Sequence, residues 1–413
     1  MTVISRQNCL ALDAADPLAH KRAAFVLPRG KIYLDGNSLG CLPAHAGARI
    51  SKAVSEEWGQ SLITSWNRHG WFEMAQKAGN RIGRLVGAAP GSVLAVDTIS
   101  INLFKLMSAA LELNPGQKTV VSDTGNFPSD LYIAEGVIRQ ISKGHVLKLT
   151  APQDLLSAID YDTPLVSVTH VDYRTARTHD IAAIVSKAHE HGALVLVDLS
   201  HTIGALPFDL AGLNVDFAVG CTYKYLNGGP GAPGFLYVRP DLQEKVQSPL
   251  SGWLGHAAPF GFEQNYRPAP GLLRWQCGTA PILSLIALEA ALDVFDDVDM
   301  MAVSNKAHAL CSQFIAHVES FGKKHGLKLA GPRATDERGS HVSFHAPNGY
   351  AIMQALIARG VIGDFRAPDM IRFGFTPLYT SFAEAFDAAE TLRDILENGA
   401  WNRPEFLAQK AVT

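Results

Sequence analysis

Short apolar runs alternate with amphipathic stretches through the middle of the chain. Most of these runs are apolar at consecutive positions, as expected of strands that are buried on both faces of a mainly parallel sheet. Between two of them, residues 181–191 predict an amphipathic helix, and Gly192 is placed to end it. Strand and helix patterns that alternate in this way indicate an α/β fold. The predicted strands are 93–96, 119–121, 165–168, 194–197, 215–219 and 235–238.

The pattern differs on either side of this region. The first residues predict an extended lead-in with a short strand at 32–35, and the pattern turns helical from about residue 45. Beyond Pro281 helical periodicity predominates. The elements expected there are helices at 283–294 and 302–321, strands around 341–345 and 370–373, and a final helix at 382–396.

A chain of 413 residues is long for one compact domain, so we expect two unequal domains. The predicted organisation is an N-terminal extended segment (1–45), a large α/β domain (46–280) and a smaller α+β C-terminal domain (281–413). The large domain is expected to hold a mainly parallel sheet sandwiched by helices.

Composition narrows the class of protein. The chain is 47% hydrophobic and 18% charged with a net charge of −3, which argues against nucleic acid or an anionic membrane as partner. The five cysteines include no C-x-x-C pair, so neither a zinc cluster nor a disulfide framework is indicated, and we expect no metal. The N-terminus lacks a continuous apolar segment, and no apolar run approaches ~18 residues. These features predict a soluble, cytoplasmic protein.

Lys224 and Asp198 are the most informative residues. Lys224 lies where an apolar strand gives way to a tight loop rich in glycine and proline, and Asp198 directly follows the strand at 194–197. Ligands of α/β sheets bind at the carboxyl ends of strands, so both side chains are expected to face one cleft. An amine that can form an imine, together with a carboxylate that can keep a ring nitrogen protonated, is what pyridoxal phosphate (PLP) requires. The alternative interpretations are that Lys224 is an ordinary lysine with its amine in solvent and that Asp198 caps a helix or turn.

Other positions suggest parts of a ligand site. The strand at 93–96 leads through Thr98 and Ser100 into a helix, whose N-terminus could bind phosphate or simply be capped by these hydroxyls. Phe127 could lie on a cofactor ring or belong to the core. Arg372, flanked by apolar residues, must be paired if buried, either with a substrate carboxylate or with a structural acid. His201 could lie beside a ring or be an ordinary loop histidine.

Together these segments resemble kynureninase, in particular its bacterial type, a family of fold-type-I PLP enzymes close to the class V aminotransferases. The likeness spans nearly the whole chain in the expected order. It is carried by Y-L-D-G-N-S-L-G at 33–40, F-P-S-D at 127–130, D-L-S-H at 198–201, C-T-Y-K-Y-L-N-G-G-P-G at 221–231, G-W-L-G-H at 252–256 and I-R-F-G-F-T-P-L-Y at 371–379.

The resemblance implies hydrolysis of the Cβ–Cγ bond of L-kynurenine to anthranilate and L-alanine, a step of tryptophan degradation. Lys224 would hold PLP and move the Cα proton, and Asp198 would pair with the ring nitrogen. Arg372 would take the substrate α-carboxylate, and Tyr223 is our candidate for the acid that protonates Cβ. Further cofactor contacts implied for this chain are Ile99, Ser100, Phe127, Asp130, Thr169, His201 and Tyr223, with Trp253 and Thr279 reaching across from the partner subunit of a homodimer.

Three further positions bear on the substrate. Trp66, Gly278 and Thr279 resemble the bacterial pattern, which favours L-kynurenine over its 3-hydroxy form. We therefore expect these residues to contact or shape the substrate site.

Two alternatives remain open from the sequence. The chain could be another fold-type-I PLP enzyme, such as a cysteine desulfurase-like lyase or an aminotransferase. A desulfurase would need a nucleophilic cysteine on a late loop, whereas Cys311 lies in a predicted helix with no cysteine after it. The chain could also be a regulatory or structural protein that keeps the fold without turnover, but Lys224, Asp198 and Arg372 are all present.

Overall fold

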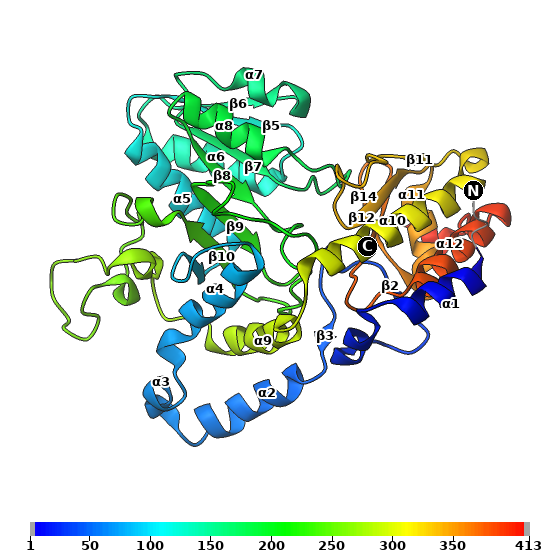
Figure 1. Cartoon of the computed structure of the whole chain (residues 1–413), viewed down its shortest axis with the longest axis horizontal. Coiled ribbons are helices and arrows are strands. Elements are labelled where there is room, and N and C mark those ends of the chain that lie inside the picture. The colour runs from blue at the N-terminus through cyan, green and yellow to red at the C-terminus, as the bar shows by residue number, and fades with distance from the viewer. Residues whose placement is uncertain (1–4, 409–413) are drawn as a thin grey trace.

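The computed structural model describes residues 5–408, and a seven-stranded sheet forms the middle of the larger part of the molecule (Figure 1). The strand order is β4-β10-β9-β8-β7-β5-β6. Neighbours from β9 to β6 run parallel, whereas β10 is antiparallel to both β4 and β9. The strands are β4 (Val93–Ala95), β5 (Thr119–Asp123), β6 (Val146–Thr150), β7 (Leu165–Thr169), β8 (Leu194–Asp198), β9 (Phe217–Cys221) and β10 (Gly234–Val238).

All six strands predicted in this region are present, and the sheet is mainly parallel as expected. Strands β7 to β10 are buried at every position, which explains why they are apolar on both faces. The sequence did not reveal β6, because this edge strand pairs only with β5 and its side chains are exposed or half-buried. No continuous apolar run therefore marks it.

Helices cover both faces of the sheet (Figure 1). The predicted helix at 181–191 is α8, and Gly192 follows it with a φ of 74°, a left-handed conformation that glycine adopts without strain. The helices of this region are α2 (Ala46–Lys52), α3 (Ser65–Arg68), α4 (Met74–Leu85), α5 (Ile99–Leu113), α6 (Pro128–Ile141), α7 (Leu155–Ala158), α8 (Ile181–Glu190) and α9 (Ile282–Leu292).

A second, antiparallel sheet has the order β11-β12-β15-β14 and its own hydrophobic core. Its strands, β11 (Lys328–Leu329), β12 (His341–His345), β14 (Asp364–Arg366) and β15 (Met370–Gly374), include both strands predicted there. The helices around it are α10 (Met300–Gly322), α11 (Gly349–Ala358), α12 (Phe382–Glu397) and α13 (Pro404–Leu407). The predicted helices at 283–294, 302–321 and 382–396 thus correspond to α9, α10 and α12.

The prediction of an extended lead-in was wrong in part, because residues Arg6–Ala15 form helix α1, which contacts α12. The hydroxyl of Ser5 caps this helix by accepting a hydrogen bond from the Asn8 main-chain N–H at 3.2 Å, and Cys9 is buried in the second core. The expected strand at 32–35 is shorter, since β2 (Ile32–Tyr33) pairs in parallel with β13 (Val361–Ile362).

The segment after β2 runs between the two sheets and is bonded to β15 of the smaller one and to the loop after β9 of the larger one. The main-chain N–H of Gly374, at the end of β15, donates to Leu34 O at 2.7 Å, while Gly40 N–H donates to Tyr223 O at 2.7 Å. A Cβ on Gly374 would lie only 1.6 Å from Oδ1 of Asn37, so this close approach requires glycine. The segment thereby brings the end of β15 beside the Lys224 loop. In the part of the chain described, no helix has the length and apolar character needed to span a membrane.

Candidate active site

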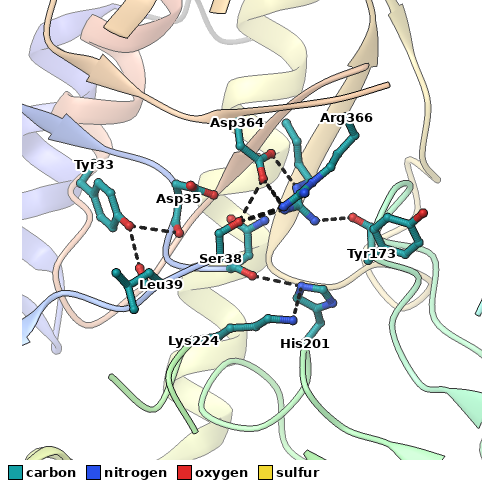
Figure 2. A network of polar contacts seen from close by, with 11 residues as sticks. Tyr33, Asp35, Ser38, Leu39, Tyr173, His201, Lys224, Asp364 and Arg366 are labelled. Atoms are coloured by element: carbon teal, nitrogen blue, oxygen red, sulfur yellow. Dashed lines mark hydrogen bonds and ion pairs between the residues drawn. The ribbon is translucent and has the colours of Figure 1, made fainter. Parts of the chain in front are cut away.

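Lys224 lies three residues beyond the end of β9 and faces a cavity of about 120 Å³. Its Nζ is 3.3 Å from Nε2 of His201, and the same ring nitrogen is 3.1 Å from Asn37 O (Figure 2). Burial, followed by the charge of the Lys224 ammonium, lowers the pKa of His201 well below its usual value, so this imidazole is neutral. The other residues that line the cavity are Asn37, Ser38, Phe127, Tyr173, Tyr223, Arg366 and Arg372.

Aromatic rings surround the lysine amine. Its Nζ lies 5.9 Å from the ring centroids of both Phe127 and Tyr223. Phe127 packs edge-on against Tyr173 with ring centroids 5.0 Å apart, yet 39% of its surface remains exposed. The interpretation of Phe127 as a core residue is therefore wrong, and its ring is available to a ligand in the cavity.

Two buried carboxyl groups lie close enough to Lys224 to feel its charge. Asp198 ends β8, and its Oδ1 accepts a hydrogen bond from the Ser200 N–H at 2.7 Å. Burial raises the pKa of Asp198, although the Ser200 hydrogen bonds and the Lys224 ammonium oppose the shift. Burial and repulsion from Asp198 raise the pKa of Asp130, in the first turn of α6, well above its usual value. A cationic ring placed here would compensate this excess of acid.

Three more expected cofactor residues lie at the same edge of the sheet. Thr169 pairs directly with Asp198 across β7 and β8. Ile99 and Ser100 open α5, and Ser100 Oγ lies 3.4 Å from Oγ of Ser129 in the first turn of α6, so two helix N-termini meet there. Such termini present free N–H groups to an anion. Capping also occurs, since Thr98 Oγ1 accepts from Ile101 N–H at 3.4 Å.

Arg372 is fully buried on β15 and reaches the cavity wall. Its guanidinium is paired with Asp364, which stands directly opposite it on β14. Burial raises the pKa of Asp364, but the charge and hydrogen bonds of Arg372 outweigh burial and hold it below its usual value. Arg372 is therefore paired with a structural acid and also borders the cavity, so its expected contact with a substrate carboxylate stays a prediction.

Sequence reasoning assigned no role to several residues that line or support the site. Asn37 and Ser38 belong to the Y-L-D-G-N-S-L-G motif at 33–40, but nothing in their spacing indicates that they lie beside Lys224. Asp364 and Arg366 carry a usable signal, because alternate residues of a strand share one face. Tyr173 carries none, since it lies in a loop beyond β7.

Several expected site residues do not border this cavity within the described chain. Asp198, Asp130, Thr169, Ile99 and Ser100 lie at the same edge of the sheet, outside its lining, whereas Trp66, Trp253, Gly278 and Thr279 lie elsewhere. Gly278 and Thr279 are exposed, and 41% of the surface of Trp253 is accessible. Trp66 and Trp253 belong to an aromatic cluster with Phe72, Phe260 and Phe262, whose successive ring centroids are 4.7–6.4 Å apart. Trp66 and Phe72 are half-buried, whereas the other three rings are exposed. In a single chain these residues lie apart from the Lys224 cavity.

Asp35 lies near Asp364 and Arg372 and is a carboxyl group whose charge changes near neutral pH. Burial and repulsion from Asp364 raise the pKa of Asp35 to about 7, against the opposing charges of Arg372 and Arg366 and a hydrogen bond with Ser38. Tyr225, from the Lys224 loop, also interacts with this carboxylate.

Because the folded pKa of Asp35 exceeds the unfolded value, the folded state holds this proton more tightly, and the unfolding free energy should fall as pH rises from about 4 to 7. Asp35→Asn removes the ionisable group, so the variant should gain on the order of 2 kcal/mol over wild type at pH 8 and little at pH 4.5. Urea unfolding at both pH values measures this difference. The exposed-site variant Asp336→Asn serves as control, and a gain that does not change with pH would contradict the assignment.

Solved structures of other proteins share the fold of this chain. It aligns with a cysteine desulfurase from Thermococcus onnurineus at a TM-score of 0.75 and 16% identity, and with a cysteine desulfurase from Escherichia coli at 0.77 and 18%, each alignment covering 92% of this chain and 98% of the other. A mutant of C-DES with glycine covalently linked to its PLP cofactor aligns at 0.76 and 19%, over 90% and 98%. The fold is that of the fold-type-I PLP-dependent enzymes.

Sequence relatives identify the family within this class. Residues 303–392 match the kynureninase C-terminal domain. The chain is 51% identical to kynureninase from Burkholderia pseudomallei and 50% identical to kynureninase from Pseudomonas fluorescens, in each case over 99% of this chain and all of the relative. The chain belongs to the kynureninase family.

Proposed function

We propose that this protein is a PLP-dependent hydrolase that cleaves the Cβ–Cγ bond of L-kynurenine and yields anthranilate and L-alanine. Full-length identity of 51% to a kynureninase carries this proposal. The chemistry of the cavity agrees with it, since an amine, a buried carboxyl group, an accessible phenyl ring and two helix N-termini meet at one edge of the sheet. When bound, PLP supplies an electron-withdrawing ring that stabilises negative charge at the substrate Cα.

We assign the residues that would hold PLP on the basis of this arrangement. Lys224 provides the amine for covalent attachment, and Asp198 provides a buried negative charge for the ring nitrogen. Phe127 offers its exposed ring face, and the neutral His201 packs beside the lysine. The N-termini of α5 and α6, with Ser100, would receive the phosphate, while Thr169 and Asp130 complete the surrounding wall.

Two side chains are proposed to move protons. Lys224 lines the cavity and can take the Cα proton once its amine is free. The charge of Cys221 and burial raise the pKa of Tyr223 far above neutrality, so its phenol stays protonated and can donate to Cβ when the bond breaks. Water adds to the γ-carbonyl, and its oxygen leaves in the carboxylate of anthranilate.

The desulfurase alternative is disfavoured by the cysteines. Cys311 is completely buried in α10, and burial raises its pKa to about 12, so its sulfur is neither accessible nor ionised at neutral pH. The decisive assay measures anthranilate fluorescence with L-kynurenine and with 3-hydroxy-L-kynurenine, and alanine release from cysteine in parallel. We expect turnover of L-kynurenine in preference to its 3-hydroxy form, through Trp66, Gly278 and Thr279. Alanine release from cysteine alone would contradict the proposal.

We further propose a homodimer in which Trp253 and Thr279 reach the site of the partner subunit. The support is that both are accessible and that the rings of Trp253, Phe260 and Phe262 form an exposed apolar patch on the surface. We also propose that the protein acts in tryptophan catabolism in the cytoplasm. The domain limits 1–45, 46–280 and 281–413 are likewise a proposal.

Phe262→Asp tests the dimer, because this ring is 72% exposed at the edge of the aromatic cluster. A charge there should weaken association by roughly tenfold or more, and activity should then fall on dilution. Sedimentation velocity over a concentration series measures the association directly. Tyr132→Asp, at a ring that is 68% exposed elsewhere, is the matched control. Equal association of both variants and wild type would disprove the role of this surface.

A further inference from the structure

Two guanidinium groups on the cavity wall share one carboxylate. Arg372 Nε lies 2.8 Å from Asp364 Oδ1, and Nη2 of Arg366 lies 2.7 Å from Asp364 Oδ2. The hydroxyl of Ser38 accepts from both arginines, at 3.0 Å from Arg372 and 3.3 Å from Arg366 (Figure 2). The two arginines therefore form one cationic wall, but their remaining hydrogen-bonding capacity is very different.

The protein itself uses most of the donors of Arg372. A guanidinium has five N–H donors. Those of Arg372 bond to Asp364 through Nε and Nη2, to Ser38 through Nη2, and to Tyr173 O through Nη1 at 2.6 Å. One donor remains, so Arg372 can offer a ligand carboxylate its charge and a single hydrogen bond, but not a two-pronged fork unless these bonds break.

Arg366, in contrast, keeps most of its hydrogen-bond donors free within the described part of the chain. Its bonds to Asp364 and Ser38 both use Nη2, and its Nε is buried without a hydrogen-bond partner among the described residues. Its side chain is 40% exposed and borders the Lys224 cavity. A buried N–H without a partner is unfavourable, and an anion in the cavity would relieve it.

The sheet explains why both side chains reach the same wall. Asp364 pairs directly with Arg372 across β14 and β15, and Arg366 follows Asp364 by two residues on β14. Alternate residues of a strand point to one face, so Asp364 and Arg366 extend side by side toward Arg372 and the cavity. Figure 2 shows Arg366 beside Asp364, on the side of the network opposite Lys224.

We propose that Arg366 completes the binding site for the substrate α-carboxylate. Arg372, held by Asp364, contributes a fixed positive charge and one hydrogen bond, while the free donors of Arg366 bind the carboxylate oxygens. This inference rests on the proposed function in so far as the ligand is an α-amino acid. It adds a residue for which neither the sequence pattern nor the resemblance gives a role.

The test compares L-alanine with L-alaninamide, which lacks the carboxylate charge, as ligands of the PLP-loaded enzyme. Their binding is followed by the change in visible absorbance of the cofactor. Wild type should prefer alanine. Arg366→Gln should bind alanine about tenfold or more weakly and alaninamide nearly unchanged, since a charge-assisted fork is lost only for the carboxylate. Because the side chain is 40% exposed, the exchange leaves the core intact.

Arg359→Gln is the matched control, since its side chain is 39% exposed and pairs with Asp394 away from the cavity. If Arg366→Gln binds alanine and alaninamide equally more weakly than wild type does, the effect is structural and the proposal is overturned. Unchanged alanine binding in this variant would also overturn it, and so would a wild type that binds the two ligands equally well. The readout does not require kynurenine as substrate. Failure of the wild type to release anthranilate would instead count against the proposed function.

Discussion

Replacing Lys224 by alanine should abolish turnover of L-kynurenine and the visible absorbance band of the bound cofactor. Lys224 is the one lysine that lines the cavity, and within the described chain it forms no ion pair. Its nearest polar neighbour is the neutral His201, so the amine is held in position without being neutralised by a salt bridge. Removal therefore eliminates the only amine available for covalent attachment at this site.

Anthranilate fluorescence and an absorbance scan of the purified variant measure the two effects together. Lys187→Ala, at a half-buried position of α8 away from the cavity, controls for loss of a lysine, since Lys187 pairs with Glu190. Turnover within tenfold of wild type in Lys224→Ala would rule out the assignment of this residue.

The second large effect is expected from Asp198→Asn, which should retain cofactor yet lose roughly 10²–10⁴-fold in kcat. Asparagine has nearly the same shape and its carbonyl can still accept the Ser200 N–H bond, so the local fold persists. What disappears is the buried negative charge that would keep the ring nitrogen protonated. The effect thus falls on the rate and not on binding of the cofactor.

Stability provides an independent check on the same variant. Because burial raises the pKa of Asp198, ionising it in the empty site is unfavourable, and a neutral amide should leave the apoprotein at least as stable as wild type near pH 7. Thermal melts of the apoproteins, together with single-turnover rates of the loaded enzymes, separate the two effects. Asp180→Asn, which preserves an N-cap on α8, is the control. A kcat near that of wild type would eliminate the proposed role.

The strands of the central sheet could be predicted because burial on both faces leaves a direct mark in the sequence. Runs such as 194–197 and 235–238 are apolar at consecutive positions, and both became strands buried throughout. Edge strand β6 and helix α1 were missed for the opposite reason. Their stability comes from partners elsewhere in the chain, β5 and α12, and local periodicity does not record such partners.

The sequence by itself determined the α/β class, the candidate lysine and acid, and the likeness to the kynureninase family. These features depend on residue type and short-range order, because an apolar run or a lysine after a strand is visible within a few positions. The tertiary structure alone decided that Arg372 is paired with Asp364, that Arg366 retains free donors, and that the segment at 34–40 lies between the two sheets. Charge pairing and burial depend on distances between atoms far apart in the chain, which the order of residues does not specify.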